Sequence, residues 1–363
     1  MIHIMKVKKD TTVFVGVSGG VDSSVAAFLL KREGYKVVGA FIKTWQPDFI
    51  ECTWRQERRD AMRVCAQLEI PFITIDAEKE YKEKVGEYMI EEYRQGRTPN
   101  PDVMCNKEVK FGIFLKKSLE LGADFVATGH YAQRREGEKS IQLLRGVDSI
   151  KDQTYFLWIL SQEQLKHVLF PVGGFPKAKV REIAKKIGLF TARKKDSQGV
   201  CFLGEIDMKN FLSHYIQKKE GDVLNMQGET IGSHYGALFF TYGERHGFHI
   251  NKKGTQDKPL YVVAKDIEKN TITVSENISD RERFIDAQKI TIAQTVWNHP
   301  IKNGGQYTAV VRYNQEPQNC TVFYEQDKLV FVIEFSEPQH SFSPGQSVVV
   351  YDGEVCLGGG VIV

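Results

Sequence analysis

The chain has 363 residues, enough for about two or three domains with cores of their own. Lys and Arg number 49 against 46 Asp and Glu, and this net charge of +3 neither requires nor excludes a nucleic-acid partner. No apolar run approaches the roughly 18 residues of a membrane span, and the first residues lack the apolar core of a secretory signal. The composition predicts a cytoplasmic globular protein that has no membrane partner.

The first half of the chain alternates short apolar runs with longer amphipathic ones. We expect buried strands in TTVFVGV (11–17), YKVVGAFI (35–42), PFITID (71–76) and DFVATGH (124–130). Helical spacing falls between them, in DSSVAAFLLKREG (22–34), WRQERRDAMRVCAQLE (54–69) and KEYKEKVGEYMIEEYRQG (79–96). Gly34 suits the position just past the first helix. Strands that alternate with helices form parallel sheets, so the pattern predicts a doubly wound α/β domain.

The pattern remains helical to about Ile216 and changes after Gly221. From there the apolar runs are short and alternate with polar residues, as in QYTAVVRY (306–313) and KLVFVIEF (328–335), which is typical of small barrels or sandwiches. The segment DIEKN (266–270) indicates a hairpin connection. We therefore expect an α/β domain over residues 1–205, a small central domain over 206–280, mainly β after one helix, and a C-terminal β-barrel-like domain over 281–363.

The stretch VGVSGGVDSS (Val15–Ser24) leads from the first predicted strand into the first predicted helix. Its glycines allow close approach to the backbone and its serines offer hydroxyl donors. The N–H groups at a helix N-terminus favour an anion such as phosphate. The stretch matches neither the G-x-x-x-x-G-K-[ST] pattern nor the G-x-G-x-x-G pattern of a dinucleotide site. The alternative interpretation is a plain strand-to-helix turn, for which Gly and Ser are also suited.

Two of the six cysteines follow segments rich in turn-forming residues. Cys105 closes GRTPNPDVMC, three residues after Asp102, and Cys201 follows a glycine in KKDSQGVCFLGE, near Lys194 and Lys195. Basic neighbours lower the pKa of a thiol and favour the nucleophilic thiolate. The absence of a C-x-x-C pair argues against a structural zinc or iron–sulfur site. The other cysteines are interpreted as small buried hydrophobic residues: Cys52, Cys65, Cys320 and Cys356.

The glycine-rich stretch resembles the S-G-G-x-D-S loop of the PP-loop ATP pyrophosphatase family, whose members cleave ATP between its α and β phosphates. Further motifs follow in order: RTPNPDVMCN, ATGHYA, LLRGVDSIKDQTYFL, DSQGVCF, VRYNQ and SPGQSVVVYDGEVCLGGG. Together they resemble the tRNA-specific 2-thiouridylases of that family over nearly the whole chain. The sister iron–sulfur tRNA thiolases carry C-x-x-C pairs, which are missing here. Ile42 stands where the family often has Met, in the motif Met-Lys-Asn-Trp.

The resemblance implies a tRNA-uridine 2-sulfurtransferase that uses ATP and Mg²⁺. The C2 oxygen of the wobble uridine is adenylated, and sulfur then comes from a cysteine persulfide that a persulfide-donating sulfur-transfer protein loads. The resemblance assigns Cys105 as the nucleophile and Cys201 as the persulfide carrier, roles that the residues alone do not tell apart. Asp102 is placed to act as a base, either on Cys105 or near the uridine. The implied nucleotide site comprises Gly16, Val17, Ser18, Gly19, Gly20, Val21, Asp22, Ser23, Ile42 and Gly129.

Contacts with an unpaired base and the surrounding tRNA are implied as well, in part from the C-terminal domain. The implied RNA-binding residues are Asn100, Pro101, Asp102, His130, Lys151, Asp152, Gln153, Arg312, Tyr313 and Gln346. Without the resemblance, His130 at the end of a predicted strand is equally compatible with a ligand-binding role and with a buried structural one. We interpret the neighbouring aromatic residues as core: Tyr155, Phe156 and Trp158.

The segment Lys177–Lys195 holds eight Lys or Arg residues and one acid, Glu182. We favour a phosphate-binding patch over a solvated helix face, because RNA binding depends on such local charge. Two other functions remain open at this point. A PP-loop enzyme that adenylates another tRNA base or a small molecule does not need the two cysteines, and a non-catalytic sulfur carrier or tRNA-binding protein does not need the ATP loop.

Overall fold

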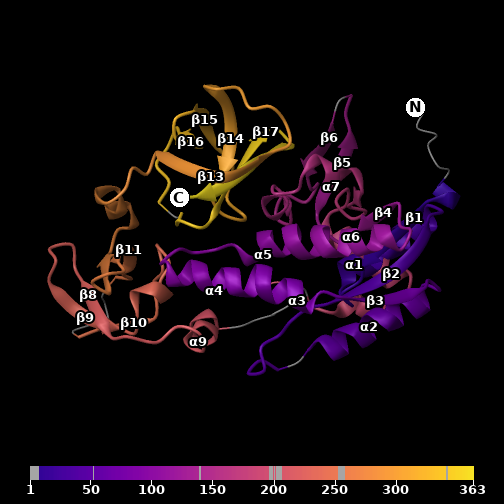
Figure 1. Ribbon diagram of the computed structural model, residues 1–363, viewed down its shortest axis with the longest axis horizontal. Coiled ribbons are helices and arrows are strands. Elements are labelled where there is room, and N and C mark those ends of the chain that lie inside the picture. Colours follow the sequence, from indigo (N-terminus) through magenta and orange to yellow (C-terminus); the bar gives the residue numbers. More distant parts are fainter. Residues whose placement is uncertain are drawn as a thin grey trace.

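The computed structural model describes residues 8–51, 53–138, 140–195, 199, 201, 207–251, 258–340 and 342–363. Cys52, the boundary expected near residue 205 and most of the motif DSQGVCF lie outside this set, whereas Cys201 is within it. Figure 1 shows an α/β part, a smaller sheet and a barrel arranged around the helices α4 and α5. No helix within the described ranges combines the length and apolar character needed to cross a bilayer.

The first domain is built on a five-stranded parallel sheet. Its strands lie in the order β3-β2-β1-β4-β7. Alternate side chains of β1 enter separate cores, with Val13 and Val15 on one face and Phe14 on the other. Helices cover both faces, so the predicted doubly wound fold is confirmed. The strand bounds are β1 (Thr12–Gly16), β2 (Lys36–Lys43), β3 (Phe72–Asp76), β4 (Phe125–Ala127) and β7 (Val168–Leu169).

The order of the strands fixes where this sheet binds ligands. The chain proceeds from β1 through β2 to β3 on one side, and β4 then lies on the other side of β1. Between β1 and β4 the strand order reverses, and doubly wound sheets bind ligands outside the carboxyl ends of the strands at such a point. The glycine-rich stretch follows β1, and Gly129 and His130 follow β4.

The helices of the first half occupy the predicted segments. Gly34, with φ of +92°, follows the C-cap residue Glu33 of α1, as expected for a left-handed C′ residue. The helical run predicted over 79–96 is interrupted by a π-turn, η2. The helix bounds are α1 (Val21–Arg32), α2 (Trp54–Gln67), α3 (Glu78–Tyr81), η2 (Lys82–Gly86), α4 (Glu87–Arg94), α5 (Pro101–Met104), η3 (Cys105–Ile113), α6 (Phe114–Glu120), α7 (Gln162–Lys166), α8 (Lys177–Lys186) and α9 (Met208–Ser213). The short 3₁₀ turns are η1 (Lys8–Asp10), η4 (Thr154–Phe156), η5 (Phe190–Arg193), η6 (Ala237–Phe239) and η7 (Ile278–Arg283).

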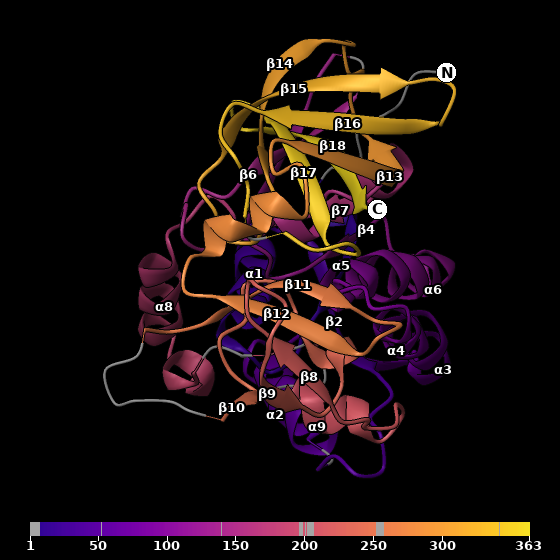
Figure 2. The same ribbon diagram turned by 90° about the vertical axis from the view of Figure 1, so that its left-hand side faces the viewer.

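The expectation that the first half is helical outside the parallel sheet is wrong for one hairpin. β5 (Ala132–Glu136) and β6 (Ile141–Arg145) are antiparallel strands. β6 pairs with the C-terminal strand β18, through Leu144↔Val355 and Leu143↔Cys356. The hairpin is largely polar, and a partner strand more than 200 residues away leaves no local pattern in the sequence. Its position extends the barrel sheet onto the first domain (Figure 2).

The central domain is a five-stranded sheet in the order β10-β9-β8-β12-β11. β11 and β12 are antiparallel and joined through residues 267–270, which confirms the predicted hairpin. Its small core includes Val223, Phe240 and Val262. The strand bounds are β8 (Gly221–Leu224), β9 (Thr230–His234), β10 (Phe248–Ile250), β11 (Tyr261–Asp266) and β12 (Thr271–Ser275).

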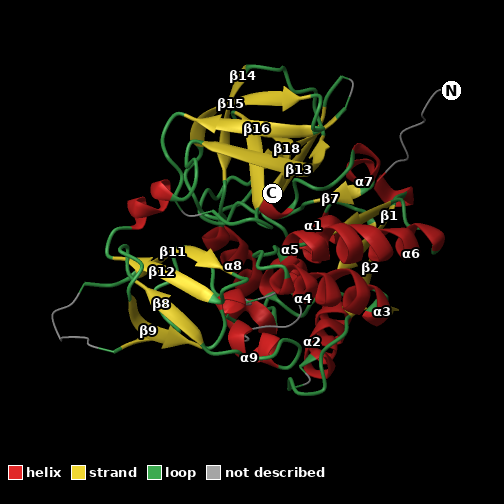
Figure 3. Ribbon diagram, turned by 60° about the vertical axis from the view of Figure 1, so that its left-hand side comes forward, coloured by secondary structure: helices red, strands yellow, loops and turns green. Residues whose placement is uncertain are grey.

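The C-terminal domain is a closed six-stranded barrel, since β13 pairs with both β16 and β18. Closure requires glycine at Gly358, because a Cβ there would lie 2.0 Å from the carbonyl oxygen of Val296 on β13. The predicted mainly β second half is thereby confirmed (Figure 3). The strand bounds are β13 (Lys289–Trp297), β14 (Gly305–Val310), β15 (Gln318–Glu325), β16 (Val330–Phe335), β17 (Ser347–Asp352) and β18 (Val355–Ile362).

The three domains meet at the short link between α4 and α5. The N–H of Thr98 donates to the carbonyl of Pro344 in the barrel domain at 2.7 Å, and its hydroxyl lies 3.2 Å from that of Thr241 in the central domain. Gly345 must be glycine here, because its φ is +90° and a Cβ would lie 2.9 Å from the carbonyl oxygen of Thr98. The link leads directly into α5, which carries Asp102.

Candidate active site

The glycine-rich stretch forms a tight turn between β1 and α1. Gly19 has φ of +74°, and a Cβ on it would lie 2.8 Å from Cβ of Asp60, so only glycine fits. The N–H of Ser18 donates to the Ser23 hydroxyl at 3.3 Å, and the Ser24 hydroxyl donates to the carbonyl of Gly20 at 2.7 Å. The turn therefore presents the N-terminus of a twelve-residue helix at the carboxyl edge of the sheet.

The segment after β4 closes against this turn. A Cβ on Gly129 would lie 2.6 Å from the backbone nitrogen of Ser23 and 2.8 Å from the carbonyl carbon of Asp22. The Cδ1 atom of Ile42 lies nearby, 3.9 Å from the position that a Cβ on Gly16 would occupy. The structure thus brings together the residues that were predicted to line the nucleotide site.

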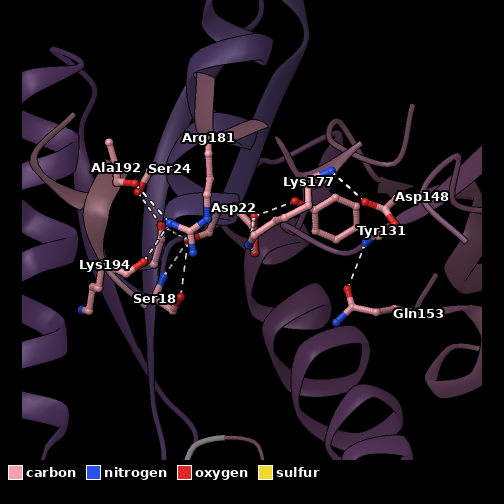
Figure 4. A network of polar contacts seen from close by, with 12 residues as sticks. Ser18, Asp22, Ser24, Tyr131, Asp148, Gln153, Lys177, Arg181, Ala192 and Lys194 are labelled. Atoms are coloured by element: carbon pink, nitrogen blue, oxygen red, sulfur yellow. Dashed lines mark hydrogen bonds and ion pairs between the residues drawn. The ribbon is translucent and has the colours of Figure 1, made fainter. Parts of the chain in front are cut away.

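Cationic side chains converge on the turn from α8 and the segment after it (Figure 4). Lys177 donates to both carboxylate oxygens of Asp22 at 2.7 Å, and Tyr131 donates to one of them at 2.8 Å. Lys194 donates to Asp60 at 2.9 Å and to the carbonyl of Gly19 at 3.2 Å. Part of the basic segment therefore faces the glycine-rich turn, an arrangement that the charge pattern alone did not indicate.

The two candidate cysteines lie together at a second point of the same edge. The thiol of Cys105, which is fully buried, donates to the sulfur of the half-buried Cys201 across 3.7 Å. The N–H of Cys201 donates to the Asp102 carboxylate at 2.9 Å, and its carbonyl accepts the Tyr81 hydroxyl at 2.6 Å. All three predicted catalytic residues are therefore in contact, although Cys201 is 96 residues from Cys105 in the sequence.

Lys110 completes this cluster through an unusual helical turn. Cys105 begins η3, a π-helical segment in which residue i bonds residue i+5, as the N–H of Phe114 does with the carbonyl of Val109. The wider turn brings Lys110 to the side of Cys105, whereas residues five apart lie on different sides of an α-helix. The Lys110 side chain hydrogen-bonds the Cys201 sulfur, and its Nζ lies 3.4 Å from Nε2 of His130.

The two thiols have opposite acidities in this arrangement. The hydrogen bond from Cys105 lowers the pKa of Cys201, and the charge of Lys110 lowers it further against the effect of burial. Burial raises the pKa of Cys105 well above its usual range. The lowered pKa expected for Cys201 is therefore present, but its cation is Lys110 and not Lys194, which is committed to Asp60.

The other titratable groups of the cluster adjust to these charges. Burial lowers the pKa of Lys110, but the negative charges of Cys201, Cys105 and Asp102 outweigh it and raise the pKa above its usual value. Burial, together with Lys110, holds the pKa of His130 well below its usual range, so this imidazole is neutral. Burial raises the pKa of the Asp102 carboxyl, against the N–H of Cys201 and the charge of Lys110.

Two of the predicted RNA-binding residues, Asn100 and Tyr313, lie beside Tyr155 in η4. Asn100 caps α5 by accepting the N–H of Val103 at 3.2 Å and also hydrogen-bonds the Tyr155 hydroxyl. The same hydroxyl donates to the carbonyl of Ser347 at 3.2 Å. The ring of Tyr313 lies 6.4 Å from that of Tyr155. Segments from the first domain and the barrel therefore meet at Tyr155, beside α5.

Several of these residues also have structural contacts. The Asp152 carboxylate accepts the N–H groups of Gly146 and Thr154, both at 3.1 Å, and Gln153 accepts the N–H of Tyr131 at 3.0 Å. Arg312 donates to the carbonyl of Tyr242 at 3.4 Å. A side-chain oxygen of Gln346 is buried without a partner, and Lys151 is half-buried. Their roles toward RNA stay predictions.

His130 has the surroundings of a structural histidine. It is 7% exposed, its ring lies 5.9 Å from that of Phe111 and 6.3 Å from that of Phe170, and Thr128 Oγ1 lies 2.8 Å from its Nδ1. Tyr155 and Trp158 are buried in the main core, and Phe156 packs against it, as predicted from the sequence. Cys65, Cys320 and Cys356 are buried, as expected for core residues.

Comparison with known proteins identifies the family to which the chain belongs. Three family models match in order: the tRNA methyl transferase HUP domain over residues 11–205, the tRNA methyl transferase PRC-barrel domain over 209–276 and the aminomethyltransferase beta-barrel domain over 287–362. The tRNA-specific 2-thiouridylase MnmA of Bacillus velezensis is 49% identical over 98% of this chain and 95% of its own length. The corresponding protein of Listeria monocytogenes serotype 4b is 47% identical over 97% and 95%. The chain belongs to the tRNA-specific 2-thiouridylase family.

Solved structures match this family member less closely. The U34-tRNA thiolase NcsA from Methanococcus maripaludis is 18% identical, with 57% of this chain and 64% of that chain covered and a TM-score of 0.36. A 4-thiouridine synthetase in complex with RNA and ATP is 21% identical, with 53% and 44% covered and a TM-score of 0.34. At these scores neither structure supports an argument about the site.

Three residues of this 2-thiouridylase site were missed by sequence reasoning. Lys110 lies five residues after Cys105, a spacing that marks a common face only in a π-turn. Lys177 was recognised as part of a basic segment but not as the partner of Asp22. Tyr81 lies in a helical run where nothing distinguishes its hydroxyl from those of Tyr88 and Tyr93. For Lys110, the available signal was the motif CNKEVKF, in which this lysine follows Cys105 by five residues.

Proposed function

We propose that this tRNA-uridine 2-sulfurtransferase replaces the C2 oxygen of the wobble uridine with sulfur, at the expense of ATP. The observation that carries the proposal is the pair of sulfurs 3.7 Å apart, with Asp102 alongside, at the same sheet edge as the glycine-rich turn. His130 links the two halves of the site, since it follows Gly129 and contacts Lys110.

The turn after β1 is the proposed ATP site. Oxide is a very poor leaving group, and adenylation converts it into AMP, which leaves readily. The N–H groups at the start of α1, with the Ser18 and Ser23 hydroxyls, bind the phosphates and stabilise the charge on departing pyrophosphate. The close approach of Gly129 to Ser23, which a Cβ would prevent, fits such a cradle. Ile42 lines the nucleotide next to it.

Mg²⁺ is proposed to arrive with the phosphates of ATP. Among the described residues, no group of three or more His, Cys, Asp or Glu side chains is arranged to hold a metal ion. This fits Mg²⁺, which keeps several waters and is commonly held by substrate phosphates and one or two carboxylates. The ion would neutralise phosphate charge during adenylation.

Sulfur transfer is proposed to use the two cysteines in sequence. The terminal sulfur of a Cys201 persulfide attacks C2 of the adenylated uridine, and AMP leaves. The Cys105 thiolate then attacks the Cys201 sulfur, the bond between that sulfur and the transferred one breaks, and 2-thiouridine is released. Asp102 serves as the base for Cys105. The product is a Cys105–Cys201 disulfide, which needs little sulfur movement from 3.7 Å and must be reduced by an external thiol before the next cycle.

The tRNA is proposed to lie across the surface where α5 meets the barrel. Its unpaired base enters beside Asn100, Pro101 and Asp102, with phosphates held by Lys151 and Arg312. Residues 1–205, 206–280 and 281–363 are proposed as the catalytic, central and tRNA-contacting domains. A persulfide-donating sulfur-transfer protein of the cytoplasm would load Cys201.

The test is incubation of the protein with unmodified tRNA, ATP, Mg²⁺ and a low-molecular-weight persulfide, followed by nucleoside analysis. We expect 2-thiouridine together with AMP and pyrophosphate, none with Cys201→Ser, and full product with Cys320→Ser, which replaces a buried barrel cysteine. Release of ADP, or pyrophosphate release without 2-thiouridine, would contradict the proposal. The second outcome would favour adenylation of another base or of a small molecule.

A further inference from the structure

Lys110 owes its place beside the cysteines to the π-turn. Gly112 is part of the same turn, and a Cβ on it would lie 2.8 Å from the carbonyl oxygen of Lys107. Lys107 is exposed and pairs with Glu108 at 3.4 Å, so the two lysines of this segment have different surroundings. Lys110 points toward Cys201, and Lys107 faces solvent.

Few other groups can compensate the charge of the Cys201 sulfur. In the described part of the chain, the groups that face it are Lys110 and Cys105 from η3, Asp102 from α5 and Tyr81 from α3. Burial raises the pKa of Tyr81 well above its usual range, so this phenol stays neutral. His130, on the far side of Lys110, is neutral as well. Among the residues that the structure describes, Lys110 is therefore the cation of this cluster.

Cys105 and Cys201 are unequal partners in their contact. Cys105 is the donor and Cys201 the acceptor, and Lys110, whose charge acts on both sulfurs, hydrogen-bonds that of Cys201. A thiolate at Cys201 accepts one hydrogen bond from Cys105 and one from Lys110. A thiolate at Cys105 would sit fully buried, with no accessible surface.

We propose that Lys110 is the positioning residue that selects Cys201 as the acceptor of incoming sulfur, by holding its sulfur as a thiolate while Cys105 stays protonated and donates its S–H to it. That Cys201 accepts sulfur rests on the proposed function, whereas the difference between the two thiols rests on their contacts alone. It gives the order of events that the sequence alone left open: Cys201 reacts first, and Cys105 reacts after its proton has been removed.

The loading step that follows is balanced without an oxidant. The Cys201 thiolate forms a bond to the outer sulfur of a donor persulfide, the donor's S–S bond breaks, and the donor's inner sulfur leaves with the electron pair as a thiolate. The total charge is unchanged, and Lys110 remains beside the new persulfide. Cys105, still protonated, does not compete for the incoming sulfur.

The experiment measures the rate of iodoacetamide alkylation at Cys201 and at Cys105 against pH, by peptide mass spectrometry. Buried Cys105 reacts slowly for reasons of access, so the test uses the pH midpoint for Cys201 and not the ratio of rates. In the wild type this midpoint should fall below the value of about 8.5 for a free thiol. A wild-type midpoint above it would overturn the proposal with no variant needed.

Variants separate the charge from the packing of Lys110. Lys110→Met should raise the midpoint by at least about one unit, which is roughly a tenfold loss of thiolate at pH 7, and should slow loading from glutathione persulfide by a similar factor. Lys110→Arg should keep the midpoint within a few tenths of a unit of the wild type. Lys107→Met, on the exposed side of the same turn, should leave it unchanged. An unchanged midpoint in folded Lys110→Met refutes the selection by Lys110.

The Cys105 contact has its own test. Cys105→Ala removes the donor and should raise the Cys201 midpoint, whereas Cys105→Ser keeps a hydroxyl donor and should raise it less. Equal midpoints in both variants and the wild type would contradict the donor role. None of these measurements uses ATP or tRNA, so a failure of tRNA thiolation would leave the thiol result standing, and the reverse also holds.

Discussion

Replacing Gly129 with alanine tests whether the contact between the ends of β4 and the first turn of α1 is needed for ATP chemistry. The new Cβ would lie 2.6 Å from the backbone nitrogen of Ser23, against about 3.4 Å for an ordinary tight contact. The two nearest neighbours are backbone atoms, which cannot rotate away. The two segments must therefore separate by about 0.8 Å, and this moves the N–H groups that we propose bind the phosphates.

The size of this movement sets the expected effect. A misplacement of about 1 Å can cost about 10²-fold in rate. We expect kcat/KM for tRNA-dependent pyrophosphate release to fall about 10- to 100-fold, which is ~1.4–2.8 kcal/mol of transition-state stabilisation. Overpacking of this kind should also lower the free energy of unfolding by about 1–3 kcal/mol, which thermal unfolding without ATP would detect.

Gly174→Ala is the matched control. A Cβ there meets no atom within 4 Å, so this variant should retain its rate and its unfolding midpoint. Pyrophosphate release is measured at saturating tRNA with ATP varied, which separates KM from kcat. A folded Gly129→Ala variant with the wild-type rate would refute the assignment of this turn to ATP.

Two further predictions follow from the placement of charged side chains. Lys185→Ala and Lys186→Ala, both exposed on α8, should each weaken tRNA binding and reduce its log–log salt slope by roughly 1. Lys194→Ala should instead raise the KM for ATP, because Lys194 binds the carbonyl of Gly19. An unaltered salt slope in a filter-binding titration would show that Lys185 and Lys186 only form a solvated helix face. Burial lowers the pKa of Lys265 to about 8, so the unfolded state binds more protons than the native state between about pH 8 and 10.4, and stability attributable to this group rises over that interval. Between pH 7 and pH 10, Lys265→Met should therefore gain less free energy of unfolding than the wild type does. Exposed Lys258→Met is the control, and identical changes in all three proteins would contradict the prediction.

The sequence was sufficient to predict those features that are determined by neighbouring residues in the chain. The apolar runs around Val13 and Val37 form buried parallel strands because nothing in them competes with that conformation. The glycine-rich stretch was identifiable because small residues at a strand-to-helix turn have few other uses. Asp102 and Cys105 were placed together because they are three residues apart in the sequence.

Features with distant causes were not predictable in the same way. The hairpin β5–β6 exists as part of a larger sheet because β18 pairs with it, and neither segment carries a mark of the other. The nearness of Lys110 to Cys201 depends on a π-turn, which differs from an α-turn by one residue and has no sequence pattern of its own. Lys194 appeared to be the neighbour of Cys201 along the chain, but its ion pair with Asp60 directs it elsewhere.

The junction at Thr98 limits how this protein can be divided. Asp102 and both cysteines belong to the first domain, so that domain alone contains the reacting groups. Yet the link that carries them into place is fixed from outside, by the carbonyl of Pro344 in the barrel domain and by Thr241 in the central domain. A first domain expressed by itself should therefore keep its parallel sheet and lose the alignment of its thiols. The barrel is in this sense part of the catalytic scaffold, and recombining it with an unrelated first domain would not transfer a working enzyme.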